Sequence, residues 1–360
     1  MGSNIRPATL FVKFIFPQEE KRDGEANGPL AEGTAMKIVI RSAFALLATA
    51  ALSGAVFAQD MKKVAISTIV EVPALVETKE GVLKGLADEG FVEGKNLEVD
   101  YQNANGNMPT QQQIAKKFVG DNPDVIVPIT TPTSQAVIAA TDTIPVVFTT
   151  VTDPIKAKLI PHYEKSGGNV TGVSDAAPIM QQIELMRELV PGLKTIGFVY
   201  NPGLDNALST LEELKKQAEP FGISVVESAS PTTNEVSIAT KKLIGKVDVI
   251  YVPNDTTVVA ALESIIKIGE DVDLPVFAGE TGAVGRGVVA SVGLDYVELG
   301  RITGHMVARV LNGEKPGDID AVIAYKVLTD FKVVVNRKAA AAMGVEVPES
   351  VLARATEIIE

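Results

Sequence analysis

Two polar stretches, each at the end of an apolar strand pattern, contain the residues with the clearest capacity for chemistry. Residues 124–135 read DVIVPITTPTSQ, and residues 248–257 read DVIYVPNDTT. The Thr131-Pro132 pair begins a predicted helix, whose free N–H groups and positive end suit a carboxylate without any basic side chain. Asp255 takes the matching place in the second stretch, where it would either cap its own helix or accept an ammonium group. An anion site facing a cation site predicts a zwitterionic ligand such as an amino acid.

Other chemistry-bearing residues give little support for catalysis. The chain has no cysteine, which excludes disulfides, thiolate catalysis and Cys-ligated metal centres. Its two histidines, His162 and His305, have no nucleophile nearby in sequence, and no G-x-S-x-G, Walker A or H-E-x-x-H pattern occurs. The glycine-rich residues 282–287 lack dinucleotide-binding spacing and predict a tight turn. We therefore expect no catalytic residue, metal or cofactor, with an α/β enzyme as a remote alternative.

Charge and composition narrow the class of protein further. The net charge of −12 argues against a nucleic-acid partner, because no basic patch offsets the repulsion from phosphates. A hydrophobic content of 46% with 22% charged residues is typical of a globular protein. A length of 360 residues predicts two domains.

Strand and helix patterns alternate along the chain and occur in the same order twice. The first set has strands at 64–68, 97–101, 124–129 and 145–149 and helices at 72–89, 111–119 and 134–140. The second set has strands at 195–200, 223–227, 248–252 and 275–278 and helices at 208–221, 235–244 and 258–268. Continuous apolar strands separated by helices indicate a parallel sheet covered on both faces. The sequence therefore predicts an α/β protein of two similar doubly wound lobes.

The C-terminal part contains more elements than a second lobe needs. A strand at 288–292 and a helix at 297–311 precede strands at 321–327 and 332–335. We expect the chain to cross back near Asp295 and to return near Thr329, after a first crossing near 169–175. Three crossings make a three-stranded hinge. The first lobe is then 61–172 plus 296–327, and the second is 173–294 plus 328–360.

Polar residues gather at the carboxyl ends of the predicted strands, the edge that borders the ligand crevice in open α/β sheets. The candidate ligand contacts are Thr68, Glu71, Asn103, Thr130, Thr131, Ser134, Thr149, Asp153, Ser174, Asp175, Tyr200, Asn201, Asn206, Asn254, Asp255, Glu280, Thr281 and Asp295. Asn105 and Thr152 lie at the same edge. Any one of them could instead cap a helix or satisfy a turn.

Roles within this set follow from side-chain chemistry. Thr131 and Ser134, with backbone N–H groups, would hold a carboxylate. Asp255, with Asp175 or Glu280, would hold an ammonium group. Tyr200 would either stack on a ligand ring or cover the end of its strand.

The N-terminal region has the pattern of an export signal. From Met36 the chain reads MKIVIRSAFALLATAALSGAVFAQD, with a basic start, a short apolar run and small residues before a cut after Ala58. Residues 36–58 are therefore predicted to be a cleaved signal peptide, and residues 1–35 a leader or an over-extended start. The absence of cysteine rules out lipid attachment through a thiol. We expect a soluble, monomeric periplasmic protein.

Several phrases resemble one family of proteins along the whole chain from Lys62. They are FVEGKNLEVDYQNANG, DVIVPITTPTSQAVIAAT, IPVVFTTVTDP, GGNVTGVSD, IGFVYNP and KVDVIYVPNDTT. They look like the tryptophan/tyrosine-type ABC transporter substrate-binding proteins. The resemblance implies a type I periplasmic-binding-protein fold, a small ligand associated with aromatic amino acids, and ABC permease subunits as partners.

Two loops depart from the pattern of these relatives. Val72 stands where relatives typically carry a histidine, and Gly279-Glu280 stands where they often have Ser-Asp. Both loops are expected to line the cleft, so both could change which ligand side chain is accepted. A ligand-sensing receptor for chemotaxis or a two-component system would use the same fold. The effector domain of a repressor would need an N-terminal helix-turn-helix, where a predicted signal peptide stands instead.

Overall fold

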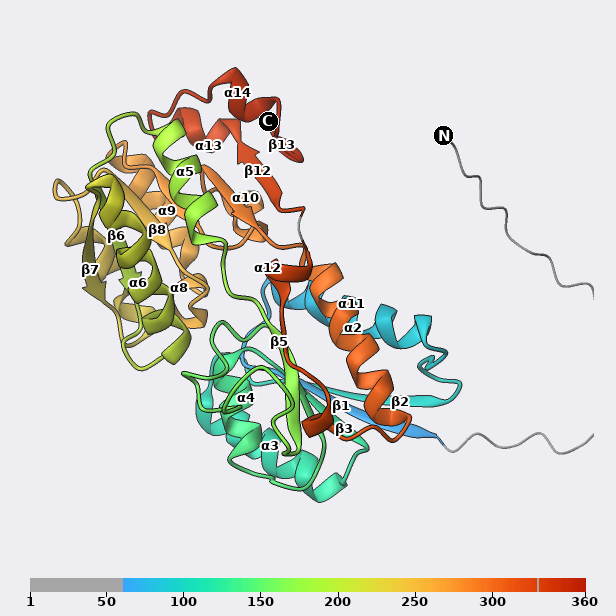
Figure 1. The fold of residues 1–360 in the computed structure, drawn as a ribbon. Helices are drawn as coiled ribbons and strands as arrows, with labels where there is room; N and C mark the ends of the chain where they lie inside the picture. Colours follow the sequence, from blue (N-terminus) through green and yellow to red (C-terminus); the bar gives the residue numbers. More distant parts are fainter. Residues whose placement is uncertain (1–60, 329) are drawn as a thin grey trace, which may run out of the picture. The chain divides into compact units, whose positions relative to one another are not determined.

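Two separate β-sheets organise the computed structural model of this chain, which describes residues 61–328 and 330–360 (Figure 1). The described residues belong to one compact unit. The predicted leader and signal peptide, and Thr329 near the predicted return crossing, lie outside the described residues.

The first sheet has six strands in the order β11-β5-β4-β3-β1-β2, and all of its pairs are parallel. Its strands are β1 (Lys62–Thr68), β2 (Leu97–Asn103), β3 (Val125–Ile129), β4 (Val146–Phe148), β5 (Val170–Ser174) and β11 (Val322–Ile323). Its helices are α2 (Pro73–Asp88), α3 (Met108–Asp121), α4 (Thr131–Ile138) and α11 (Tyr296–Leu311). Strands β3, β4 and β5 are buried along their whole length because helices cover both faces.

The second sheet has seven strands in the order β13-β12-β10-β9-β8-β6-β7. Its strands are β6 (Thr195–Tyr200), β7 (Ser224–Ala229), β8 (Val249–Val252), β9 (Val276–Ala278), β10 (Ala290–Gly293), β12 (Lys332–Asn336) and β13 (Glu357–Ile359). Its α-helices are α5 (Ile179–Leu189), α6 (Asp205–Ala218), α7 (Val236–Lys241), α8 (Thr256–Val259), α9 (Leu262–Asp271), α10 (Gly282–Arg286), α13 (Arg337–Ala342) and α14 (Glu349–Leu352). The described residues also contain three short 3₁₀ turns, η2 (Glu219–Phe221), η3 (Thr233–Glu235) and η4 (Pro316–Asp318). The predicted class of two parallel-sheet α/β lobes is confirmed, although β12 runs antiparallel to β10.

The chain passes between the two sheets three times. It leaves the first sheet after β5, returns between β10 and α11, and leaves again between α12 (Ala324–Val327) and β12. Each lobe has its own hydrophobic core, and Phe331 packs against both. The loops at the carboxyl ends of both sheets can therefore contribute to one site.

Local structure differs from expectation in three places. The strand predicted over 321–327 is only two residues long and continues as the short helix α12. The helix predicted over 258–268 is interrupted at Ala261, whose φ of −117° and ψ of 21° leave the helical region, so α8 and α9 are separate. The turn predicted over 282–287 is the short helix α10, which ends at Gly287 with a φ of +120°.

Helices α2 and α11 approach each other at the level of their backbones. A Cβ added at Gly81 would lie 2.1 Å from the Val297 carbonyl oxygen, and one at Gly300 would lie 2.1 Å from the Thr78 carbonyl oxygen. Gly85 and Gly304 repeat the contact one turn further on, so the two helices run in the same direction. Only glycine allows so close a contact.

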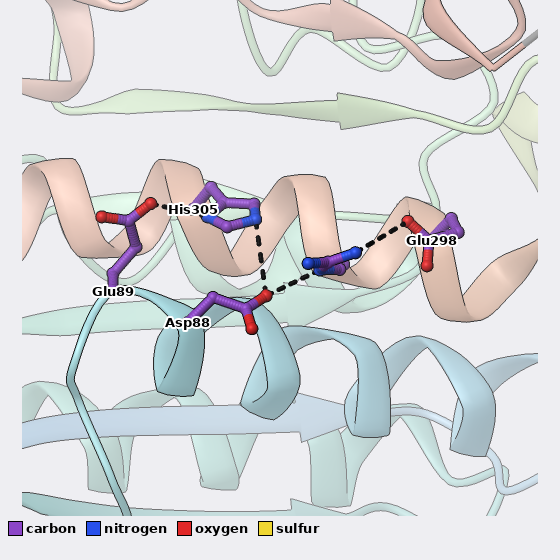
Figure 2. A network of polar contacts seen from close by, with 5 residues as sticks. Asp88, Glu89, Glu298 and His305 are labelled. Carbon is purple, nitrogen blue, oxygen red and sulfur yellow. Dashed lines mark hydrogen bonds and ion pairs between the residues drawn. The ribbon is translucent and has the colours of Figure 1, made fainter.

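Charged side chains join the same two helices near the end of α2 (Figure 2). The Arg301 Nε donates to Asp88 at 2.6 Å and its guanidinium lies 3.7 Å from Glu298. His305 lies 2.8 Å from Glu89 and 3.7 Å from Asp88. Close packing and ion pairs therefore join α2 and α11, and with them the loops at their N-termini, into one rigid element.

Candidate functional site

A small cavity of about 40 Å³ lies at the carboxyl ends of both sheets and is lined by residues of both lobes. One wall is apolar and is formed by Val70, Val72, Ala74, Leu75 and Val259. These residues come from the loop after β1, the first turn of α2, and α8. The wall can accept a hydrocarbon or aromatic group, because burying such a group removes apolar surface from water.

The start of α4 forms a second part of the cavity, through Thr130 and Thr131. The first N–H groups of a helix have no partner within the helix, and here they lie beside the cavity. Thr130 has a φ of +88°, an unfavourable value for a β-branched residue. Thr150, also in the cavity wall, has a φ of 55°. Backbone strain of this kind gathers at functional sites.

The carboxylate of Glu280 lies on the cavity with an exposed fraction of 5%. Neither of its oxygens has a hydrogen-bond partner of good geometry within the described residues. Burial raises its pKa to about 7, although the N–H groups of Gly282 and Ala283 and the charge of Arg286 act in the opposite direction. A buried carboxylate without a partner is unfavourable, so this side chain is suited to a cationic donor.

Two asparagine side chains present further acceptors to the cavity. The Asn206 Nδ2 donates to the backbone oxygen of Asn254 at 2.6 Å. The Oδ1 atoms of Asn206 and Asn254 are buried and have no partner among the described residues. With the two Glu280 oxygens they make four unpaired acceptors on one cavity, and no lysine, arginine or histidine is among the residues that line it.

The carboxylate of Asp175 also lines the cavity, but donors of the protein already surround it. Thr152 Oγ1 lies 3.3 Å away, Asn254 Nδ2 3.2 Å away and the Tyr296 hydroxyl 3.4 Å away. Burial raises the pKa of Asp175 to about 6 despite these hydrogen bonds. The predicted role of Asp175 as an ammonium acceptor is therefore less suited to its contacts than the same role for Glu280.

Asp255 is not among the residues that line the cavity, and its predicted role as ammonium acceptor does not fit its contacts. Its carboxylate accepts from the N–H groups of Asn201 at 2.6 Å, Thr257 at 2.9 Å and Val258 at 3.2 Å. It is fully buried and caps α8. Of the two roles considered from the sequence, helix capping is the one that the structure shows.

Six of the predicted site residues line the cavity: Thr130, Thr131, Asp175, Asn206, Asn254 and Glu280. The others lie outside its lining, and most of their side chains bond to nearby protein groups. Those bonded within the first lobe or the first crossing are Thr68 to Val70, Glu71 to Tyr101, Asn103 to Asn105, Ser134 to Thr130, Thr149 to Thr303, Asp153 to Ile155 and Lys156, and Ser174 to Thr152 and Ala176. Those bonded elsewhere are Tyr200 to Glu227, Asn201 to Pro231, Gly203 and Thr257, and Asp295 to Val297, Glu298 and Lys332. Thr281 stands at the start of α10.

Several lining residues were absent from the predicted set. Tyr296 follows the predicted contact Asp295 directly, and Thr150 follows Thr149, so both were one residue away in the sequence. Thr256 likewise follows the predicted Asp255, and Val70 and Val72 flank the predicted Glu71. The other residues of the apolar wall, Ala74, Leu75 and Val259, lack this signal, because the type of an apolar side chain does not distinguish a cavity wall from the core.

Residues 61–328 and 330–360 were searched for membrane-spanning helices and for metal-binding clusters. No helix in this part of the chain is long and apolar enough to cross a membrane. The same residues contain no cluster of three or more His, Asp or Glu side chains arranged to hold a metal ion.

Comparison with known proteins gives matches along nearly the whole described chain. The family model described as ABC transporter substrate binding protein matches residues 63–359. A tyrosine-binding protein of Clostridioides difficile is 39% identical over 76% of this chain and 79% of its own length. A conserved domain protein of Vibrio cholerae is 47% identical, with a TM-score of 0.80 over 83% of this chain and 100% of that chain.

Two further solved structures differ in whether a ligand is bound. An ABC domain from Streptococcus pneumoniae in complex with L-Trp is 36% identical with a TM-score of 0.78, over 83% of this chain and 99% of that chain. A ligand-free, open substrate binding protein from Clostridium difficile is 38% identical with a TM-score of 0.64 over the same shares. At similar sequence identity, this chain superposes better on the ligand complex than on the ligand-free, open structure. More distant solute binding proteins, one with bound myo-inositol at 16% identity and a TM-score of 0.54, share the fold.

Proposed function

Because this chain belongs to the family of ABC transporter substrate binding proteins, we propose that it binds a free amino acid with an aromatic side chain and delivers it to an ABC importer. The observation that carries this proposal is the set of four unpaired acceptors beside an apolar wall. An ammonium group supplies three donors, and the apolar wall suits a ring. The names of two relatives, a tyrosine-binding protein and a complex with L-Trp, support the same ligand class.

The ligand has three parts, and each has a counterpart in the cavity. The ammonium group is held by Glu280 with the Oδ1 atoms of Asn254 and Asn206, because these are the buried acceptors that lack donors. The carboxylate is held by the start of α4, where helix N–H groups, the hydroxyl of Thr131 and the hydroxyl pair of Thr130 and Thr133 lie together. The side chain packs on the apolar wall.

Closure of the two lobes around the ligand lets both lobes contact it. Two contacts outside the cavity already join the lobes across the cleft. Gln135 of α4 donates to Asp205 of α6 at 2.8 Å, and Lys156 lies 2.6 Å from Glu212 of α6. Ligand that bridges both lobes favours this closed arrangement, because it binds the closed form better than the open one.

The location and partners of the protein follow from the same proposal. The predicted signal peptide would export it to the periplasm, where the closed protein would dock on the transmembrane subunits of a permease as a monomer. The ligand would leave chemically unchanged. A ligand-sensing receptor would use the same binding step but would signal to a different membrane partner.

Isothermal calorimetry of the mature chain against Tyr, Trp, Phe, Leu and Lys tests the ligand class. We expect the aromatic amino acids to bind most tightly, and the matching deaminated acid to bind at least 100-fold more weakly, since the acceptors would then stay unpaired. Equal binding of the deaminated acid, or no binding by any amino acid, would overturn the proposal.

Mass spectrometry of ligand recovered after long incubation tests for catalysis. We expect the recovered ligand to have its original mass, and formation of any product would show an enzyme instead.

A further inference from the structure

We propose that Asp175 is a positioning residue: its carboxylate orients the amide of Asn254, so that the Asn254 Oδ1 faces the ligand as an acceptor. The inference rests on the proposed function insofar as the ligand carries an ammonium group. It assigns Asp175 a role through its neighbours instead of a direct ligand contact.

Asp175 lies where the parts of the fold meet. It directly follows β5, on the first crossing between the lobes, and has an exposed fraction of 2%. Its three side-chain partners come from three other segments: Thr152 from the first lobe after β4, Asn254 from the second lobe after β8, and Tyr296 from the start of α11. One carboxylate therefore joins both lobes and two of the crossings.

The hydrogen bonds of Asn254 determine which way its amide points. Its Nδ2 has two hydrogens, and it donates to Asp175 Oδ2 at 3.2 Å and to the Tyr296 hydroxyl oxygen at 2.9 Å. The reverse orientation would place Oδ1 against the Asp175 carboxylate, and two acceptors repel each other. Asp175 and Tyr296 thus hold the nitrogen of Asn254, and the Asn254 oxygen is left without a protein partner among the described residues.

The space around the Asn254 oxygen is kept open by a glycine. A Cβ at Gly279 would lie 2.9 Å from the Asn254 Oδ1 and 2.8 Å from the Tyr251 hydroxyl oxygen. Gly279 directly precedes Glu280, and Asn254 and Glu280 both line the cavity. An ammonium group in this cavity can be shared by both.

The central experiment measures tyrosine affinity for Asp175→Asn, Asn254→Ala and the double variant. An asparagine at 175 keeps the shape but can turn an N–H₂ group toward the Asn254 Nδ2, so we expect about a tenfold to 100-fold loss of affinity. The double variant should bind as weakly as Asn254→Ala alone, because Asp175 acts through Asn254. If the two losses multiply, Asp175 contacts the ligand independently and the proposal is wrong. Asp142→Asn, at an exposed position, is the matched control and should bind as the wild type does.

A second measurement distinguishes a change in the orientation of the Asn254 amide from a general disturbance of the folded structure. The deaminated analogue of tyrosine has no ammonium group for the Asn254 Oδ1 to accept from, so Asp175→Asn should weaken tyrosine but leave the weak binding of the analogue within about twofold. Equal fold-losses for both ligands would show that Asp175 merely holds the fold together, and would overturn the proposal.

A ligand-free cycle separates this inference from the proposed function. Urea unfolding of Asp175→Asn, Tyr296→Phe and their double variant should show non-additive losses, because the two residues share one hydrogen-bonded group. Additive losses would show that Asp175 and Tyr296 act independently, and would reject the hydrogen-bonded junction of Asp175, Asn254 and Tyr296. No amino acid binding by the wild type would reject the proposed function, while the unfolding cycle would still report on the junction.

Discussion

At the scale of single residues, the site is defined by acceptors that the protein leaves unpaired. Most buried polar side chains in the described part of the chain bond to a neighbouring group, as Asp255 and Asp175 do. Glu280, Asn206 and Asn254 keep free acceptors on one cavity, and each costs free energy until a donor arrives. Because of that cost, we expect the site to favour a cation with several N–H groups.

Glu280→Gln should remove most of the pH dependence of ligand binding. Glu280 must be ionised to hold an ammonium group, and its raised pKa of about 7 means that it gains a proton as the pH falls below neutrality. We expect wild-type affinity to fall by about tenfold or more between pH 8 and pH 5.5. The glutamine variant should bind weakly at both pH values, with a flatter profile in calorimetry. Glu184→Gln, at an exposed position outside the cavity, should keep the wild-type profile.

The same group should affect ligand-free stability in the opposite direction. Because the folded-state pKa of Glu280 is raised, the folded protein binds its proton more tightly than the unfolded chain does. Its contribution to the free energy of unfolding therefore rises as the pH falls from about 7 toward the ordinary value. Urea unfolding of wild type minus Glu280→Gln isolates this contribution, and a difference that rises with pH would contradict the assignment.

At the scale of secondary-structure elements, the α2–α11 pair positions one side of the site. Both helices begin at the cavity, with Ala74 and Leu75 in the first turn of α2 and Tyr296 at the start of α11. Their backbones touch at glycines and their side chains are joined by the ion pairs of Figure 2. The apolar wall and the Tyr296 hydroxyl are therefore held at a fixed separation.

Gly300→Ala should destabilise the protein and weaken ligand binding together. Its Cβ would lie 2.1 Å from the Thr78 carbonyl oxygen, so α2 and α11 must move apart. We expect a loss of about 1–3 kcal/mol in the free energy of unfolding, measured in urea. Gly120→Ala in α3, where a Cβ meets nothing within 4 Å, is the matched control and should be neutral or slightly stabilising. Equal effects of the two substitutions would show that the close contact is unimportant.

At the scale of the whole molecule, the two lobes are joined by their crossings, by the ligand site and by contacts at the cleft. The Lys156–Glu212 ion pair is the most exposed of these, with side-chain exposed fractions of 32% and 72%. Ion pairs so open to solvent contribute about 0–1 kcal/mol. This pair should therefore adjust the lifetime of the closed form without determining it.

Glu212→Gln should raise the ligand dissociation rate by no more than about fivefold at low salt, with little change in the association rate. Stopped-flow measurement should show the difference vanish in roughly 0.5 M NaCl, where exposed charges are screened. The exchanged pair Lys156→Glu with Glu212→Lys should restore the wild-type rate. Failure of the exchange to restore it would show that the charges do not act as a pair.

The sequence by itself determined the fold class and the edge of each sheet that bears the site. Strand and helix patterns depend on local spacing of apolar residues, so the repeated alternation could be recognised without coordinates. The carboxyl ends of parallel strands must meet at one edge, which is why Thr130, Asn254 and Glu280 could be selected as cavity residues. Three local features could not be predicted from the sequence, because they depend on tertiary packing: the antiparallel β12, the short helix α12 and the break between α8 and α9.

Only the tertiary structure decided which polar residues are free to bind. Asp255 and Glu280 both follow strands in the second half of the chain. Backbone N–H groups donate to the Asp255 carboxylate, whereas the Glu280 carboxylate has no hydrogen-bond partner of good geometry among the described residues. Asp175 meets donors from segments 23, 79 and 121 residues away in the sequence. Hydrogen-bond partners of a buried carboxylate are set by what packs around it, and residue type and spacing do not contain that information.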